Sequence, residues 1–240
     1  MAEVTLTAII VAAGAGNRLG LSTPKGFIRL GGKPLFLYSL EVLLSHKAVA
    51  GGVLVVPKGF EPRARKIVTG SGIKKKVAIV AGGKKRWQSV ENGVNAAEAE
   101  WVLVHDAARP FVTKAVIDAV LDKKSRYDCV ITVTPEADTI RTSSGGLAGE
   151  IVDRSRLVKA GTPQLFRRRV LLEAFAAAPG LPSPPTDEAV LMQLMGVPVA
   201  LAKGDPANFK ITTTADLAVA EALIAHSSTR SGRAARSSSH

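Results

Sequence analysis

The sequence is poor in cysteine and in aromatic residues, and both shortages limit what the protein can be. Its one cysteine, Cys129, cannot form a disulfide within the chain, and the apolar residues around it predict a buried core thiol rather than a nucleophile. A chain without disulfides suits a reducing compartment, so we expect a cytoplasmic protein. Aromatic residues make up 5% of the chain and are not interleaved with its basic clusters, as they are in surfaces that stack nucleic-acid bases.

Long apolar runs and metal-ligand patterns are also missing. No apolar stretch reaches the roughly 18 residues that a membrane-spanning helix requires, and the N-terminal residues lack the charged region and cleavage site of a secretory signal. We therefore expect neither membrane insertion nor secretion. The histidines are not spaced as metal ligands, and we predict no protein metal site at His46, His105, His226 or His240.

Acidic residues are scarce relative to basic ones. The chain has 32 lysines and arginines against 20 aspartates and glutamates, a formal net charge of +12. Such a charge is typical of nucleic-acid-binding proteins, but it also suits an enzyme with phosphorylated substrates, through electrostatic steering. The basic clusters are spread along the chain, at 74–76, 84–86, 123–124 and 167–169. We expect no nucleic-acid partner, and RNA binding is an alternative that a salt-dependent titration tests.

Apolar, β-branched segments alternate with segments of helical periodicity along most of the chain. The predicted strands lie near residues 6–12, 52–57, 76–81, 101–105, 128–134 and 197–202. The predicted helices lie near residues 34–47, 60–69, 86–98, 114–125, 167–177, 186–195 and 213–226. This alternation predicts a three-layer, Rossmann-like α/β fold with a mainly parallel sheet and a ligand site at the carboxyl ends of the strands. We expect one domain over 1–226 and a disordered, Ser/Arg/Gly-rich tail over 227–240.

The first predicted strand runs into a glycine-rich turn that is followed by two cations. Gly14, Gly16 and Gly20 permit tight backbone and let a ligand approach the main chain. The N–H groups of such a loop form an anion-binding concavity, to which Arg18 and Lys25 add full positive charge. No Gly-Lys-Ser/Thr follows, so this is not a Walker loop. The pattern favours a triphosphate-binding loop over a purely structural turn.

A second apolar strand, 101–105, ends in the polar pair Asp106 and Arg109. The carboxyl ends of parallel strands meet at one edge of the sheet, so these side chains are expected on the same rim as the glycine-rich loop. Residues 138–154 break the alternation, because polar and apolar residues alternate on both sides of a glycine-rich turn. This pattern predicts a β-hairpin, which needs a partner surface, either its own domain or a second subunit.

The glycine-rich loop with Pro24-Lys25, taken together with residues 105–110, resembles the 2-C-methyl-D-erythritol 4-phosphate cytidylyltransferases of the non-mevalonate isoprenoid pathway. Further matching motifs are Gly82-Gly83 with Arg86 and Ser89, Asp138-Thr139, Val152-Asp153-Arg154, Thr162-Pro163-Gln164, Thr186-Asp187-Glu188-Ala189, and Asp205 with Asn208-Phe209-Lys210-Ile211-Thr212. The resemblance covers nearly the whole chain, from about Thr5 to about Ile224. One departure is Gly26, because the family usually has glutamine after Pro-Lys, and the departure bears on the stiffness of that loop.

The resemblance implies a nucleotidyltransferase that moves a cytidylyl group from CTP to 2-C-methyl-D-erythritol 4-phosphate and releases pyrophosphate. A phosphate monoester is already an anionic nucleophile, so the sequence needs no Ser/His/Asp or Cys/His constellation, and it offers none. Catalysis would rest on positioning and on charge stabilisation by cations and by Mg²⁺, the latter held mainly through the CTP phosphates.

The resemblance also implies roles for single residues. The residues expected to stabilise charge at the reacting phosphate are Arg18, Lys25 and Lys210. Those expected to bind the nucleotide are Ala12, Ala13, Gly14, Gly16, Gly83, Ser89 and Asp106. Those expected to bind the acceptor are Asp106, Arg109, Thr139, Arg154, Thr162, Thr186, Asp205 and Lys210. In the resembled family the hairpin, here about 138–156, embraces a second subunit, so a homodimer is expected in which Thr139 and Arg154 enter the partner's site.

Several alternatives stay open. A cytidylyltransferase for another alcohol phosphate, such as ribitol 5-phosphate, would share the scaffold and differ in its acceptor. A bifunctional enzyme with a following cyclase domain is not expected, because the residues after the last predicted helix are too few to form one. Three of the candidates also have plainer roles: Ser89 as a polar surface residue, Arg109 as a structural ion-pair partner and Asp205 as the cap of a turn.

Overall fold

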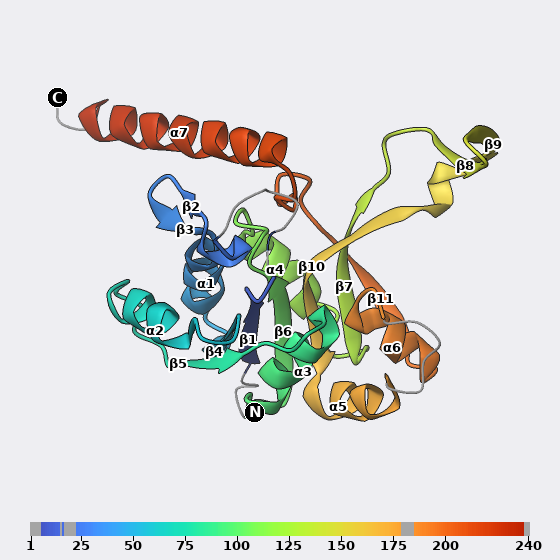
Figure 1. Cartoon of the computed structure of the whole chain (residues 1–240), viewed down its shortest axis with the longest axis horizontal. Helices are drawn as coiled ribbons and strands as arrows, with labels where there is room; N and C mark the ends of the chain where they lie inside the picture. The colour runs from blue at the N-terminus through green and yellow to red at the C-terminus, as the bar shows by residue number, and fades with distance from the viewer. Residues whose placement is uncertain (1–5, 15, 17–22, 179–184, 238–240) are drawn as a thin grey trace.

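A seven-stranded sheet, in the order β11-β7-β10-β6-β1-β4-β5, forms the centre of the protein (Figure 1). The structure is a computed structural model that describes residues 6–14, 16, 23–178 and 185–237, with backbone only for 227–237. The strands of the sheet are β1 (Leu6–Val11), β4 (Val49–Val56), β5 (Val77–Ala81), β6 (Trp101–Asp106), β7 (Cys129–Pro135), β10 (Val158–Arg167) and β11 (Val199–Lys203). β1 pairs in parallel with both β4 and β6, so their carboxyl ends share one edge.

β10 is the one strand of the sheet that runs antiparallel to its neighbours, β6 and β7. It is absent from the strands predicted from the sequence, because Thr162-Pro163-Gln164 interrupts its apolar pattern and the pairing with β7 is irregular between Gly161 and Gln164. Proline normally removes a ladder hydrogen bond, and it is tolerated here at the irregularity. The expectation of a mainly parallel sheet is confirmed.

Helices cover both faces of the sheet, which confirms the predicted three-layer α/β fold. Alternate residues of β1 face opposite layers, with Ala8 and Ile10 in one hydrophobic cluster and Ile9 in the other. The first cluster lies beneath α1 (Leu35–Ser45), α2 (Glu61–Thr69) and α4 (Lys114–Leu121). The second lies beneath α3 (Arg86–Asn95), α5 (Arg168–Ala177) and α6 (Glu188–Leu194).

The C-terminal helix α7 (Thr214–Ser237) packs outside these layers. Its buried Ala220, with Leu217 and Ile224, contacts a third cluster around Leu30 of the short hairpin β2 (Arg29–Leu30) and β3 (Lys33–Pro34). The backbone of α7 continues to Ser237, into the segment 227–240 for which the sequence predicts a disordered tail.

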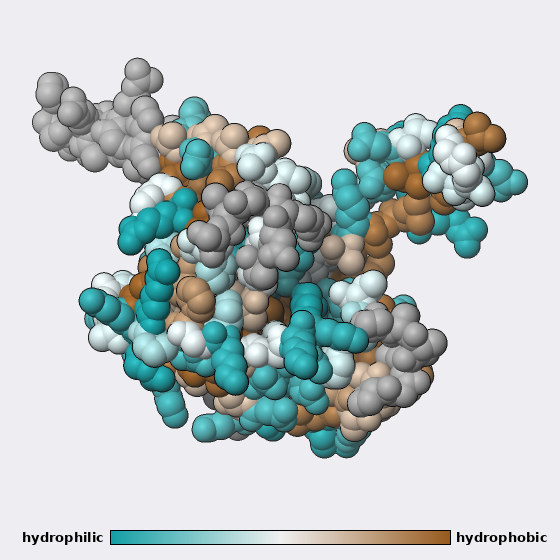
Figure 2. Space-filling model, in the orientation of Figure 1, coloured by the Kyte–Doolittle hydropathy of each residue, from teal (hydrophilic) through white to brown (hydrophobic). Residues whose placement is uncertain are grey.

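The predicted hairpin is confirmed as β8 (Ile140–Ser144) and β9 (Leu147–Val152), a separate antiparallel pair. Its turn contains two glycines with positive φ, Gly145 at 57° and Gly146 at 80°, as a tight two-residue hairpin turn requires. The hairpin projects from the body instead of folding back onto it (Figure 1). Leu147 is 76% exposed and Ile151 62%, and Figure 2 shows apolar surface along this projection. We call residues 138–156 the arm.

His105 lies inside β6 and is fully buried. Its Nδ1 is 3.0 Å from the Thr162 hydroxyl and its Nε2 is 2.9 Å from the backbone oxygen of Arg109. The Thr162 hydroxyl also accepts a hydrogen bond from the backbone N–H of Asp106, so it donates its own proton to Nδ1. This network suits a neutral imidazole with its proton on Nε2, and burial lowers the pKa of His105 to about 4.

Acid is therefore expected to destabilise the fold through His105. An unfolded histidine has a pKa near 6.5, so the contribution of His105 is complete above that pH and is lost as the pH falls towards 4. The loss in the free energy of unfolding should be about 3 kcal/mol. Urea titrations at pH 7 and pH 4 measure it.

The matched controls are two glutamine variants. His105→Gln should lose less stability on acidification than the original protein, because it has no buried imidazole to protonate. His226→Gln, on the exposed surface of α7, should lose as much as the original. An equal loss in His105→Gln and the original protein would mean that other groups carry the acid sensitivity.

Candidate active site

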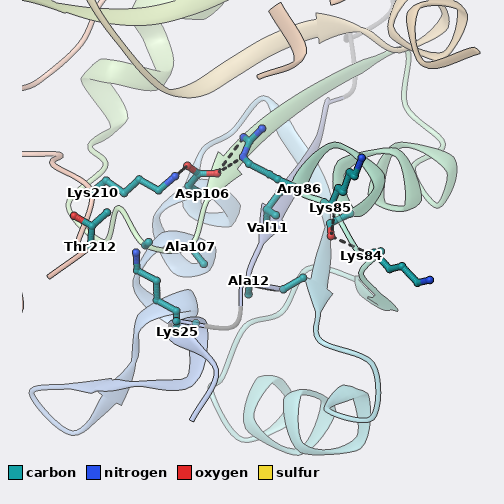
Figure 3. Close-up of a pocket in the computed structure, with 17 residues that line it drawn as sticks. Val11, Ala12, Lys25, Lys84, Lys85, Arg86, Asp106, Ala107, Lys210 and Thr212 are labelled. Carbon is teal, nitrogen blue, oxygen red and sulfur yellow. Dashed lines mark hydrogen bonds and ion pairs between the residues drawn. The ribbon is translucent and has the colours of Figure 1, made fainter. Parts of the chain in front are cut away.

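A cavity of about 420 Å³ opens at the edge of the sheet where β1 and β6 end (Figure 3). Small residues of the glycine-rich loop and the turn that leads into α3 both line it. The segments that line it are 11–14, 16, 25–26, 83–86 with Ser89, 106–108, and Lys210 with Thr212. Strand ends and helix starts thus converge where an α/β sheet binds its ligand.

The seven predicted nucleotide-binding residues all line this cavity: Ala12, Ala13, Gly14, Gly16, Gly83, Ser89 and Asp106. Two of the three predicted catalytic cations, Lys25 and Lys210, also line it, and their side chains enter from different segments (Figure 3). The third, Arg18, lies outside the described residues.

Close backbone packing places Lys25 at the cavity. The backbone N–H of Lys25 donates to the carbonyl of Gly14 at 3.1 Å, which ties the short 3₁₀ helix η2 (Lys25–Phe27) to the end of the glycine-rich loop. A Cβ on the buried Gly26 would lie 2.7 Å from the Cβ of Ala12. Glycine at this position therefore lets the turn lie directly against the end of β1.

Ser89, in the first turns of α3, also lines the cavity. It is 2% exposed, which rules out the surface role left open for it. Its hydroxyl oxygen accepts from the backbone N–H of Gly83 at 3.1 Å, and its proton points to the carbonyl of Lys85 at 3.2 Å. The hydroxyl is thus used as a donor within the protein and can offer a ligand only its remaining oxygen lone pair.

Asp106 joins the two cationic sides of the cavity (Figure 3). Its Oδ2 accepts from Lys210 Nζ at 2.8 Å, and its Oδ1 accepts from Arg86 Nε and Nη2 at 3.1 and 3.0 Å. Burial alone raises the pKa of this carboxyl, but Arg86 and Lys210 outweigh burial and hold the pKa well below its usual range. Asp106 is therefore a permanent carboxylate and does not serve as a proton donor or acceptor near neutral pH.

Arg86 extends this charge chain to α6. Its Nη1 donates to both carboxylate oxygens of Glu188 at 2.8 Å, and Glu188 has no exposed surface. Both residues lie within motifs that carry the family resemblance, but neither was among the predicted site residues. The only sequence signal for the pairing is that each is a charged residue within a motif, because they are far apart along the chain.

Arg109 and Thr162 lie behind the cavity rather than in its lining. Arg109 Nη1 donates to the carbonyl of Asn208 at 3.0 Å, and the Asn208 side chain donates to the carbonyl of Thr162 at 3.0 Å. Arg109 makes no direct ion pair within the described part of the chain, but its charge helps to lower the pKa of Asp106, so the role of a structural charge partner stays open. The Thr162 hydroxyl thus supports the backbone of Asp106, and the Arg109 guanidinium supports the backbone of Asn208.

Four other predicted acceptor residues lie outside the cavity of this chain. Thr139 and Arg154 are exposed on the arm, where the Arg154 guanidinium donates to the carbonyl of Ala137. Thr186 is exposed before α6. Asp205 accepts from the backbone N–H of Ala207 at 2.8 Å, which is the turn-capping role left open for it. The cavity lining therefore contains only Asp106 and Lys210 of the predicted acceptor residues.

The described residues by themselves provide few ligands for a divalent ion. No three histidine, cysteine, aspartate or glutamate side chains within those ranges gather as a metal site. Asp106 is the only carboxylate that the structure places in the cavity lining, and both of its oxygens accept from cations. A Mg²⁺ ion would thus fit here through the oxygens of a bound triphosphate.

Among the helices described, none is long and apolar enough to cross a membrane.

Comparison with known proteins agrees with this site. The family model described as IspD, 2-C-methyl-D-erythritol 4-phosphate cytidylyltransferase, matches residues 6–226. A protein of that description from Deinococcus radiodurans is 40% identical over 219 residues, which cover 91% of this chain and 89% of the relative. The crystal structure of the protein of that description from Thermus thermophilus has a TM-score of 0.76 at 33% identity, covering 90% of this chain and 97% of that one.

Other relatives are longer. The "Bifunctional enzyme IspD/IspF" of Anaeromyxobacter dehalogenans is 41% identical over 220 residues, which are 90% of this chain but 56% of the relative. The chain thus spans little more than half the length of that protein. The match of one family model from β1 into α7, with relatives covered almost end to end, shows that the chain belongs to the 2-C-methyl-D-erythritol 4-phosphate cytidylyltransferase family.

Proposed function

We propose that this chain transfers the cytidylyl group of CTP to 2-C-methyl-D-erythritol 4-phosphate, giving 4-diphosphocytidyl-2-C-methyl-D-erythritol and pyrophosphate. The observation that carries the proposal is the cavity at the ends of β1 and β6, where a glycine-rich loop faces Lys25, Lys210 and the fixed carboxylate of Asp106. Membership of the family supplies the two substrates.

The cytosine and the triphosphate of CTP are expected in different parts of the cavity. Ala12, Ala13 and Gly14 line the cavity with small side chains that let a ligand approach the main chain, and Gly83 and Ser89 line it as well. The polar edge of cytosine is expected against these residues, where main-chain donors and acceptors can form hydrogen bonds with it. The triphosphate is then directed towards Lys25 and Lys210.

The chemical step needs cations more than bases. An oxygen of the acceptor phosphate attacks the α-phosphorus, the new P–O bond forms, and the bond to the departing pyrophosphate breaks. The nucleophile is already an anion, so no residue has to remove its proton. Lys25 and Lys210 offset the negative charge that builds at the α-phosphate, together with Arg18 as the sequence predicts. When bound to the phosphate oxygens, Mg²⁺ supplies further charge neutralisation.

The arm completes the site across a dimer in this proposal. Thr139 and Arg154 lie on a projection that leaves the body of its own subunit, and the arm also exposes Leu147 and Ile151 (Figures 1 and 2). A second copy of the chain would cover that apolar surface and receive Arg154 near its cavity. Arginine suits this place, because its guanidinium can hold a phosphate with two parallel hydrogen bonds.

Removal of the Lys25 ammonium tests the proposed chemistry. Lys25→Ala should lower kcat by about a hundredfold or more, because charge stabilisation at the reacting phosphorus is lost. Pyrophosphate release from CTP, UTP and ATP, with methylerythritol phosphate and ribitol 5-phosphate as acceptors, is the measurement. Lys58→Ala, at an exposed lysine of the loop before α2, is the control and should keep the original rate. A Lys25→Ala enzyme with near-original turnover would remove this lysine from the mechanism, and turnover with ribitol 5-phosphate alone would reassign the acceptor.

Subunit mixing tests the shared site. Arg154→Ala and Lys25→Ala homodimers should each be inactive, because each lacks one half of every site. After subunit exchange, a mixed dimer holds one site with both defects and one with neither, so it should recover about half of the original activity per mixed dimer. Native mass spectrometry follows the exchange. Exchange without recovered activity would show that Arg154 does not act in the partner's site.

A further inference from the structure

We propose that Arg86 is a positioning residue that aligns Lys210 through Asp106 and locks the nucleotide wall of the cavity to helix α6 through Glu188. The inference deepens the proposed function and rests on it. It starts from a chain of contacts that runs Lys210, Asp106, Arg86, Glu188, with every nitrogen–oxygen distance between 2.8 and 3.1 Å.

The geometry of this chain assigns one carboxylate oxygen to each cation. Arg86 occupies Oδ1 of Asp106 with two N–H groups, which leaves Oδ2 for the ammonium of Lys210. A carboxylate held on one side by a planar guanidinium has little freedom to rotate. Lys210 is therefore fixed at the cavity by a partner whose own orientation Arg86 sets.

Only arginine has the donors for this arrangement. Arg86 uses Nε and Nη2 for Asp106 while Nη1 spans both oxygens of Glu188, so a single side chain serves two carboxylates at once. A lysine would keep the charge, but its single ammonium cannot reach both partners in the same way. The substitution Arg86→Lys therefore keeps the positive charge and removes the alignment of the two carboxylates.

The burial of Glu188 indicates that this chain of contacts does more than stabilise the fold. Glu188 is fully buried and Arg86 is 28% exposed, so desolvation of the carboxylate offsets much of the attraction within the pair. Burial raises the pKa of Glu188 despite the adjacent Arg86, whereas the two carboxylates together raise the pKa of Arg86. What the pair does provide is a fixed connection between the start of α3 and the start of α6.

The contact between Arg86 and Glu188 joins the predicted nucleotide-binding part of the cavity to the predicted acceptor-binding part. Arg86 begins α3 directly after the wall formed by Gly83, and Glu188 begins α6 just after Thr186, a predicted acceptor residue. Loss of the link is expected to disturb the placement of the acceptor more than the affinity for CTP, because the cavity wall that faces the base stays in place.

The test compares Arg86→Lys with Arg167→Lys. Arg167 also bridges two carboxylates, Glu100 and Asp128, at 2.6 Å each, but it lies outside the cavity lining. Relative to the original enzyme, Arg86→Lys should lower kcat at least tenfold and leave the KM for CTP within threefold. Arg167→Lys should change neither. Calorimetry with CTP in the absence of the acceptor should show unchanged nucleotide binding by Arg86→Lys.

A second variant keeps the inference testable if Arg86→Lys folds poorly. Glu188→Gln retains the shape of the side chain and leaves Arg86 on Asp106, and it should raise the KM for the acceptor phosphate at least threefold with the KM for CTP unchanged. Melting temperatures of all variants identify any loss of folding.

Each outcome has a definite meaning. A kcat for Arg86→Lys within twofold of the original, or a rise in the KM for CTP with kcat unchanged, would overturn the positioning role. An equal rise in both KM values for Glu188→Gln would overturn the link to the acceptor side. If the original protein makes no cytidylyl product with any acceptor, the proposed function fails first, and the inference fails with it.

Discussion

The carboxylate of Asp106 is the contact on which the geometry of the cavity depends. It ends β6, receives Lys210 from the segment after β11, and receives Arg86 from the start of α3. Segments far apart in the sequence are thereby fixed by one buried group, whose backbone N–H is in turn held by the Thr162 hydroxyl. A low pKa keeps this group charged, so the fixed positions of both cations do not depend on pH near neutrality.

The parts of the site that follow strand ends were predictable from the sequence. A parallel sheet brings the carboxyl ends of β1 and β6 to one edge, so Gly14 and Asp106 had to meet once the strands were identified. The pattern of the glycine-rich loop added Lys25 and the resemblance added Lys210, and both residues line the same cavity. Periodicity was sufficient for Gly14 and Asp106 because each lies directly beside a regular strand.

Side-chain pairing across the fold was not predictable in the same way. Arg86 and Glu188 meet only because α3 and α6 lie on the same face of the sheet, and nothing in local sequence encodes that distance. Strand β10 was missed because its proline and polar residues belong to the irregular pairing that places Thr162 beneath Asp106. In both cases tertiary contacts, which no local pattern reports, decided the outcome.

The charged residues of the cavity form two groups. Lys210 and Arg86 are matched by Asp106 and Glu188, so this inner set is neutral as a whole and supplies alignment rather than long-range attraction. Lys84 and Lys85 stand on the exposed rim, across the cavity from Lys25 (Figure 3), and attract anionic ligands from solution. Salt screens such exposed charges far more than buried, hydrogen-bonded ones. In the proposed reaction, capture of the anionic substrates and alignment of the reacting groups thus depend on different residues of the same basic surface.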